Sequence, residues 1–331
     1  IFFVWGESGA GKSSFAVHTI AKVHKALMSA RRSSIITRNV CSDGDNLVPF
    51  SLFRSIFRDV LSEKPMGEDG SFGSGGTGSY RDRDWDSVSL SSLSTAQSQK
   101  TSVIGRLREI CEEMDAPSGF LEIVGHHLLG NSRLKMSSVE KAPELADIVS
   151  FMAQVFIRST SHAEVVVLAL DDVQWMDNLS WKVLHSIFEN GLNVLIVCGS
   201  RPFESQSLTM DDDFWDMLRE ESREEGRYDE ILLGPLAKNE VRELASLTLK
   251  CDPDEILDKF IDDIYMHSGG MPYYASEILQ NCVRNKLFRR FDNNMIGWRP
   301  QRRNVSMPYL LECMVCEIIS SRLMFSYSYK K

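Results

Sequence analysis

The chain has 331 residues, of which 43% are hydrophobic and 25% are charged, so it is long enough for one large globular domain or two smaller ones. Its formal net charge of −9 argues against a large nucleic-acid-binding surface, because such a surface is basic. No apolar run approaches the ~18 residues that a membrane-spanning helix requires, so we expect no membrane span in this chain.

The first predicted element is a buried strand, because the chain opens with the apolar run Ile1–Trp5. This run leads directly into Gly6-Glu7-Ser8-Gly9-Ala10-Gly11-Lys12-Ser13, which fits the phosphate-binding pattern G-x-x-x-x-G-K-[ST] at every position. Apolar residues near helical spacing follow, at Phe15, Ile20, Val23 and Leu27. A strand before the pattern and a helix after it are the context that this motif requires.

The residue types of this loop suit a polyphosphate and its metal ion. Gly6 and Gly11 let the backbone turn tightly and come close to the ligand. Successive N–H groups at the start of the following helix face the anion. Lys12 can reach the β- and γ-phosphates, and the Ser13 hydroxyl can ligate Mg²⁺. We therefore expect the nucleotide to be bound by Gly6, Glu7, Ser8, Gly9, Ala10, Gly11, Lys12, Ser13 and Ser14.

A short second strand is predicted at Ser33–Val40, and a helix with one strongly apolar face at Pro49–Leu61. The composition then changes, because Glu63–Lys100 is rich in Gly and Ser and cannot bury enough apolar area to offset its ordering entropy. We expect a flexible insertion at about residues 63–101. A phosphorylated regulatory loop is an alternative interpretation of the same segment.

Two continuous apolar runs, Ala163–Leu170 and Leu192–Cys198, are typical of fully buried parallel strands. Ile231–Leu233 is a short strand that closes the series. Helices are predicted between these strands and before them, at 104–114, 120–129, 143–159, 177–190 and, with a very acidic and solvated face, 210–226. Residues 1–233 are therefore expected to form the first domain.

From Gly234 onward the sequence predicts helices and no further strands. Asp252-Pro253 supplies an N-cap and a proline at the first helical position, and Gly269-Gly270 supplies a helix end. The helices are expected at 238–249, 253–267, 272–288 and 308–322. Strands that alternate with helices, followed by helices alone, predict an α/β fold: a P-loop NTPase three-layer sandwich with a parallel sheet, followed by an all-helical domain.

Two acidic residues, Asp171 and Asp172, follow the first buried run directly. In P-loop NTPases an acidic residue at the end of a buried strand holds the metal ion. We expect Asp171 to be the Mg²⁺ partner and Asp172 to orient or deprotonate the attacking water; the alternative is that both residues cap a turn. Arg201 follows the next buried strand, where it can reach the γ-phosphate as a sensor or charge-stabilising group. An ordinary loop arginine is the alternative.

The cysteines are scattered along the chain and seven in number. Cys313 and Cys316 form a C-x-x-C pair, but no second pair and no nearby His completes a zinc set, so core packing is the favoured role. This usage predicts a reducing, intracellular compartment, here the cytoplasm. The chain opens with Ile1 inside a predicted strand rather than with an initiator Met, which suggests an excerpt of a longer protein.

Several segments together resemble one known family. DDVQWMD, residues 171–177, resembles the extended acidic motif of STAND-class P-loop ATPases, and more narrowly that of the Orc1-like AAA ATPase domain found beside nucleotide cyclases and protein kinases. Further segments are similar to the family's sensor strand, linker and lid, in that order: VCGSRP at 197–202, ILLGPLAKNEVRELA at 231–245 and HSGGMPYYASEIL at 267–279.

This resemblance implies a signalling switch that binds ATP or ADP with Mg²⁺, hydrolyses ATP, and gates an attached effector domain or a self-assembly. It implies that residues 234–331 form a helical lid leading toward a truncated winged-helix region. Within the lid, Gly270 and Pro272 would be the G-x-P element, with Pro272 against the adenine.

Other functions use the same loop. A DNA-associated ATPase of the origin-recognition type is one alternative, disfavoured by the acidic balance and supported only by the cluster Arg299, Arg302 and Arg303. A degenerate nucleotide-binding scaffold without turnover is another, and a small-molecule kinase a third. A GTPase is disfavoured because the sequence has no N-K-x-D motif.

Overall fold

The computed structural model describes residues 1–62, 103, 105–116, 120–121, 124–125, 144–190, 193–202, 220, 226–292 and 294–299. Several predictions fall outside these residues: the insertion at 63–101, nearly all of the acidic helix at 210–226, the last helix at 308–322 with its two cysteines, and the winged-helix region.

Five strands form one sheet in the order β2-β3-β4-β1-β5, so that β4 separates β1 from β3. β2 and β3 pair in parallel, with Ser34 opposite Val165 and Val40 opposite Asp171, and β3 pairs in parallel with β4. The predicted α/β fold with a parallel sheet is confirmed. The strand bounds are β1 Phe2–Gly6, β2 Ser34–Val40, β3 Val165–Asp171, β4 Val194–Ser200 and β5 Asp229–Leu233.

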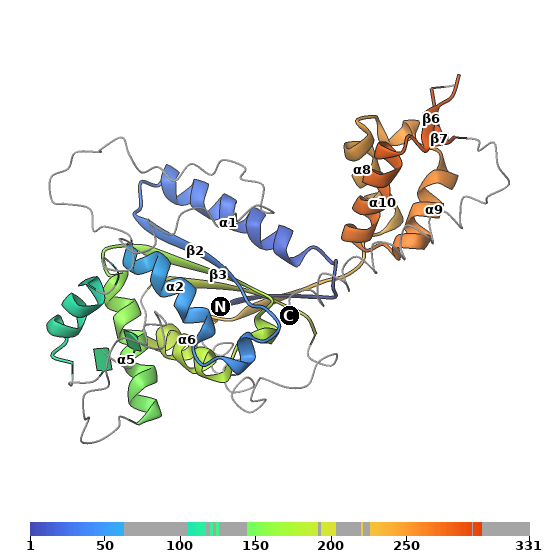
Figure 1. Cartoon of the computed structure of the whole chain (residues 1–331). Coiled ribbons are helices and arrows are strands. Elements are labelled where there is room, and N and C mark those ends of the chain that lie inside the picture. The colour runs from blue at the N-terminus through green and yellow to red at the C-terminus, as the bar shows by residue number, and fades with distance from the viewer. Residues whose placement is uncertain are drawn as a thin grey trace, which may run out of the picture. The chain divides into compact units, whose positions relative to one another are not determined.

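Helices cover both faces of β2 and β3 (Figure 1). α1 (Lys12–Ser29) lies on one face, and three helices lie on the other: α2 Ser51–Ser62, α5 Leu145–Ser159 and α6 Asn178–Asn190. Residues 105–113 are helical as well. The sheet thus forms the middle layer of the predicted three-layer sandwich, which is the arrangement that buries both of its apolar faces.

The apolar face predicted for α2 is wholly buried. Its members are each at most 5% exposed: Phe50, Leu52, Phe53, Ile56, Phe57, Val60 and Leu61. The ring of Phe57 meets the ring of Phe156 of α5 edge-on, with the centroids 6.5 Å apart. Burying each large apolar side chain is worth about 1.5–3 kcal/mol, so α2 is held chiefly by this face.

The helical region after β5 has its own core. Helices α8 (Lys238–Leu249), α9 (Asp258–Ser268) and α10 (Pro272–Arg284) bring together a cluster of residues that are at most 1% exposed. Its members are Val241, Ala245, Ile256, Phe260, Ile261, Ile264, Ala275, Ile278, Leu279 and Cys282. The predicted helices at 238–249 and 272 onward are therefore confirmed, and Gly269 ends α9 in the left-handed conformation, as predicted.

The prediction that strands stop at Gly234 is wrong. β6 (Phe288–Arg290) and β7 (Ile296–Trp298) pair as an antiparallel hairpin. Trp298 Nε1 donates to Asp263 Oδ2 at 2.8 Å, and the Trp298 ring lies 4.3 Å from that of Phe260 in α9. Strands of three residues are too short to show an alternating pattern, so packing against α9 decides this structure rather than local sequence.

The helix predicted at 253–267 is divided in two. A single 3₁₀ turn, η4, spans Pro253–Glu255, and α9 begins only after Ile256 and Leu257, which are extended. Ile256 pairs with Ile296 of β7, and the Leu257 N–H donates to the Ile296 carbonyl oxygen at 2.9 Å. Pairing with the hairpin therefore interrupts the helix that the sequence favours.

α10 ends at Arg284 rather than at Phe288. Lys286 adopts a left-handed conformation with φ of 52°, and the Leu287 N–H donates to the Cys282 carbonyl oxygen at 3.0 Å. This pattern of bonds is typical of a helix end at which glycine usually stands. Because lysine occupies the left-handed position, the sequence carries no stop signal there.

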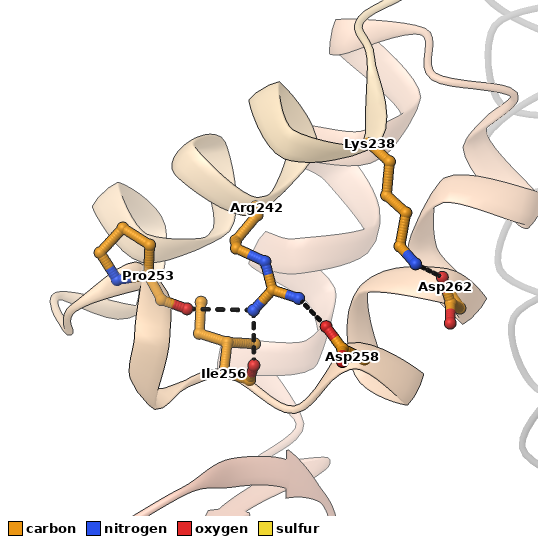
Figure 2. Close-up of polar contacts among 6 residues, drawn as sticks. All are labelled: Lys238, Arg242, Pro253, Ile256, Asp258 and Asp262. Carbon is orange, nitrogen blue, oxygen red and sulfur yellow. Dashed lines mark hydrogen bonds and ion pairs between the residues drawn. The ribbon is translucent and has the colours of Figure 1, made fainter.

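Arg242 ties α8 to the turn before α9 (Figure 2). Its Nη1 donates to the carbonyl oxygens of Pro253 at 3.1 Å and Ile256 at 2.6 Å, and its Nη2 donates to Asp258. The guanidinium thus binds two carbonyl groups of the irregular segment, and the Pro253 oxygen also accepts the Ile256 N–H at 3.2 Å. Nearby, Lys238 of α8 forms an ion pair with Asp262 of α9.

The described cysteines are free thiols, and Cys41, Cys198 and Cys282 are buried. Burial raises the pKa of Cys198 and of Cys282 to about 12, so both thiols are neutral and pack as small apolar groups.

The chain divides into two compact units. The first contains Ile1–Phe3, Ala16–Gly199 and Gln206–Asp229, and the second contains Val4–Phe15, Ser200–Ser205 and Glu230–Lys331. The division runs through β1 and differs from the boundary at residues 233 and 234, which remains a prediction. Among the described residues, no helix combines the length and apolar character needed to cross a bilayer.

Candidate functional site

The loop between β1 and α1 depends on a close approach of two strand ends. β1 ends at Gly6, and a Cβ atom added there would lie 2.9 Å from the carbonyl oxygen of Leu233 in β5 and 3.0 Å from the Cβ of Ala10. Those distances are shorter than van der Waals contact, so only glycine fits. Gly6 is therefore required by packing as well as by any approach of a ligand.

Two further glycines give the loop its curvature. Gly9 has φ of 89° and Gly11 has φ of 93°, a region that residues with a Cβ adopt only at a cost of about 1–3 kcal/mol. The Ala10 N–H donates to the Glu7 carbonyl oxygen at 3.1 Å, which closes a turn within the loop. Among the described residues other than its two chain neighbours, none has an atom within 4 Å of the position that a Cβ of Gly11 would take, so the loop is open at this point.

Lys12 folds back over the loop that precedes it. Its Nζ donates to the carbonyl oxygens of Gly6 at 2.7 Å and Glu7 at 3.1 Å, and the residue is only 7% exposed. Ser13 and Ser14 are exposed on the first turn of α1, where backbone N–H groups have no acceptor within the helix. A buried ammonium beside a helix N-terminus is well suited to a polyphosphate.

Asp171 is the last residue of β3 and is 6% exposed. Its Oδ1 accepts a hydrogen bond from the Asp172 N–H at 3.1 Å. A Cβ added to Gly199 of β4 would lie 2.7 Å from the same oxygen, so the absence of a side chain at Gly199 makes room for this carboxylate. The predicted metal partner is thus a buried carboxylate held at the carboxyl end of a central strand.

Asp172 begins the turn after β3 and has φ of 54°. Aspartate tolerates this left-handed conformation better than most residues do. Its Oδ1 accepts a hydrogen bond from Gln174 Nε2 at 3.0 Å, and Gln174 itself is 7% exposed. The glutamine therefore fixes the orientation of the carboxylate that we expect to handle the attacking water.

Asp177 joins two helices that are distant in the sequence. Its Oδ1 accepts hydrogen bonds from the N–H of Ser180 at 2.9 Å and of Phe50 at 3.0 Å. Its Oδ2 accepts from the Ser180 hydroxyl at 2.5 Å and from the Ser51 N–H at 3.1 Å. One carboxylate, 4% exposed, thus caps α6 and also α2. The cap on α2 was not predicted from the sequence.

The segment that contains Gly270 and Pro272 contacts both the linker and the phosphate loop. Gly270 has φ of 74°, and a Cβ there would lie 2.6 Å from the Leu236 carbonyl oxygen. Pro272 is the first residue of α10, where its missing N–H carries no cost. The N–H of the next residue, Tyr273, donates to the Gly9 carbonyl oxygen at 3.1 Å. The start of α10 is therefore bonded to the phosphate loop.

Comparison with known proteins assigns the family. The model of the AAA ATPase domain family matches residues 1–197, which is more than half of the chain. The chain belongs to the AAA ATPase domain family. The STAND class and the association with cyclases or kinases remain expectations. No curated protein sequence matches the chain.

Solved structures include distant likenesses to this AAA ATPase domain. The ORC2 protein of Aeropyrum pernix, in ADPNP–ADP complexes, is 11% identical in sequence, with a TM-score of 0.44. The match covers 95% of this chain and 61% of the ORC2 chain. The Walker-type ATPase PABY2304 of Pyrococcus abyssi is 11% identical in sequence, with a TM-score of 0.36. That match covers 99% of this chain and 69% of the PABY2304 chain. The chain thus spans 61% of the length of the first protein. Likenesses this distant do not bear on its activity.

The residues of this AAA ATPase domain fit the ligands that the family implies, a nucleotide and usually Mg²⁺. The curved glycine loop and Lys12 offer donors and positive charge to phosphates. The Ser13 hydroxyl and the Asp171 carboxylate are hard oxygen donors, and Mg²⁺ commonly takes one or two such protein ligands besides water and phosphate oxygens. A Mg²⁺ ion held by donors of this kind would neutralise phosphate charge.

Arg201 of the AAA ATPase domain comes directly after the end of β4 at Ser200, as the sequence predicts. Three residues with a place in the site were not predicted from sequence. Gln174 lies within the DDVQWMD motif and could have been noticed there. Gly199 leaves room for the Asp171 carboxylate, and Arg38 Nη2 lies 3.8 Å from Asp171 Oδ2. Nothing in the sequence next to Gly199 or Arg38 indicates these contacts.

Proposed function

We propose that this AAA ATPase domain is a nucleotide-dependent switch that binds ATP and ADP, hydrolyses ATP, and gates an attached effector domain or an assembly. The proposal is carried by the presence, in one chain, of an intact phosphate loop over which Lys12 folds and of two successive carboxylates at the end of β3. The family match supports nucleotide binding, and the two carboxylates support turnover.

In this proposal each loop residue acts on the phosphates. Backbone N–H groups of the loop and of the first turn of α1, other than that of Ala10, face the anion. Lys12 exchanges its contacts with the loop carbonyls for the β- and γ-phosphates. Asp171 holds Mg²⁺ directly or through water, together with the Ser13 hydroxyl. Because Lys12 is already buried, little further desolvation opposes the new contacts.

The proposed roles in hydrolysis fall to Asp172 and Arg201. Asp172 orients the attacking water and accepts its proton, with Gln174 fixing the carboxylate. Arg201 stabilises charge on the γ-phosphate. A carboxylate that is hydrogen-bonded on one oxygen keeps the other for the water, which suits this division of labour.

The proposed switch involves the helical lid. Pro272 lies against the adenine, and the bond from Tyr273 N–H to the Gly9 carbonyl oxygen links α10 to the phosphate loop. A change of nucleotide that alters the conformation of the loop would therefore move the start of α10. Residues 234–331 are proposed to be the moving part.

We expect Lys12→Ala to weaken the binding of ATP by about 1–3 kcal/mol, the scale of a lost charged hydrogen bond. The reason is that Lys12 is the only positively charged residue among the phosphate ligands predicted in the loop sequence. The measurement is a titration of the purified chain with fluorescent ATP and ADP, with and without Mg²⁺.

Lys22→Ala is the matched control, since Lys22 is an exposed lysine of the same helix. It should bind as the parent does. Asp171→Ala should mainly remove the dependence on Mg²⁺. If the Lys12 and Asp171 variants both bind Mg·ATP like the parent, the assignment of the site is wrong. Binding without turnover by the parent would instead favour a scaffold.

A further inference from the structure

The carboxylate of Asp171 faces an arginine from the neighbouring strand. Arg38 Nη2 lies 3.8 Å from Asp171 Oδ2, with the two side chains 20% and 7% exposed. Both residues belong to the first compact unit, so the pair is a feature of the strands themselves. An ion pair this far from water is screened much less than one on the surface.

The register of β2 and β3 creates the pair. Arg38 stands opposite Ala169, and Val40 stands opposite Asp171. Side chains two residues apart on a strand share a face, so Arg38 and Asp171 project from the same face of the sheet. A shift of one residue in this register would turn Arg38 to the other face and remove the pair.

The two oxygens of Asp171 have different neighbours. Oδ1 accepts the Asp172 N–H and lies against the bare Cα of Gly199, which fixes its position. Oδ2 is the oxygen that faces Arg38. At 3.8 Å the contact is ionic rather than a hydrogen bond, because donor and acceptor in a hydrogen bond lie within about 3.2 Å.

Charge explains why an arginine is useful at this position. A buried carboxylate without a cationic or hydrogen-bonding partner is strongly unfavourable, and Arg38 supplies one cation near Asp171 when no metal is bound. Mg²⁺ at Asp171 would place two further positive charges close to the guanidinium, and like charges at this range repel. Arg38 and Mg²⁺ should therefore oppose one another at the same carboxylate.

We propose that Arg38 is a positioning residue that holds Asp171 in place before the metal arrives and competes with Mg²⁺ for its carboxylate. The inference rests on the proposed function, because it takes Asp171 to be the Mg²⁺ partner. Arg38 and the ligands of the ion would then together set the Mg²⁺ concentration that the site requires.

The test is the Mg²⁺ dependence of fluorescent ADP binding. Arg38→Gln should reach half-saturation at a Mg²⁺ concentration about three- to tenfold below that of the parent, since one opposing charge is removed. Arg38→Lys keeps the charge and should stay close to the parent. Arg106→Gln is the matched control, because it removes an arginine from an ion pair with Glu109 on an exposed helix face.

Thermal unfolding in EDTA gives a second readout that needs no nucleotide. Arg38→Gln should unfold at a lower temperature than the parent, and adding Asp171→Asn should recover most of the loss, because the double variant buries neither charge. An unchanged or higher Mg²⁺ requirement in Arg38→Gln would overturn this inference alone. Absence of nucleotide binding by the folded parent would overturn the proposed function and the inference with it.

Discussion

Replacing Asp177 by alanine is expected to lower the free energy of unfolding by about 3–5 kcal/mol, the scale of breaking a buried charged network. The substitution leaves the buried Ser180 hydroxyl and N–H, and the Phe50 N–H, without their common acceptor. Phe50 adds to the effect, because its φ of 58° is costly for a bulky residue and the bond to Asp177 helps to hold it.

The measurement is urea unfolding of the purified chain. Asp177→Asn should lose less than Asp177→Ala, because one amide oxygen still accepts. Asp252→Ala is the matched control, since Asp252 precedes a helical turn but makes no side-chain cap bond, and it should cost less than about 0.5 kcal/mol. If the Asp177 and Asp252 variants lost the same free energy of unfolding, the cap that Asp177 provides to two helices would not add to the stability.

Replacing Asp172 by asparagine is expected to slow ATP hydrolysis by about 10²–10⁴-fold while leaving the affinity for Mg·ATP nearly unchanged. The asparagine oxygen can still accept the bond from Gln174 Nε2, so the turn after β3 should be preserved. What is lost is the capacity to take a proton from the attacking water.

Phosphate release under single-turnover conditions measures the hydrolysis, and fluorescent ATP titration measures the binding. Gln174→Ala is a useful companion, because it should reduce turnover less than Asp172→Asn does while leaving the carboxylate in place. Turnover by Asp172→Asn at the parent's rate would remove Asp172 from the mechanism and direct attention to another base.

The parts of the fold that were predicted from sequence are those with local causes. The glycine loop is specified by glycines whose positive φ angles no other residue adopts readily, and α2 by an apolar face that is buried throughout. Asp171 was placed at a strand end because a continuous apolar run stops there. Each of these features can be recognised within about a dozen residues, which is the range over which periodicity acts.

The parts that could not be predicted depend on partners distant in sequence. Asp177 caps α2 across 127 positions, and the ion pair of Arg38 with Asp171 exists only in one register of two strands. Ile256 is extended because β7 pairs with it. Lys250 and Lys286 end helices in a conformation that sequence rules assign to glycine. In the first three cases tertiary contacts override or supplement the local preference, whereas the two helix ends are closed by local main-chain bonds at lysines that carry no stop signal.

The bond between Tyr273 and Gly9 is made entirely by main-chain atoms. Substitution of the Tyr273 side chain need not break it, so the identity of residue 273 can drift during evolution while the connection persists. Proline is the exception, because it has no N–H to donate. The second position of a helix otherwise accepts proline, since its N–H has no helical acceptor. A proline at residue 273 would thus remove the hydrogen bond to Gly9 and leave α10 folded. The link between the phosphate loop and α10 can therefore be removed without unfolding the helix.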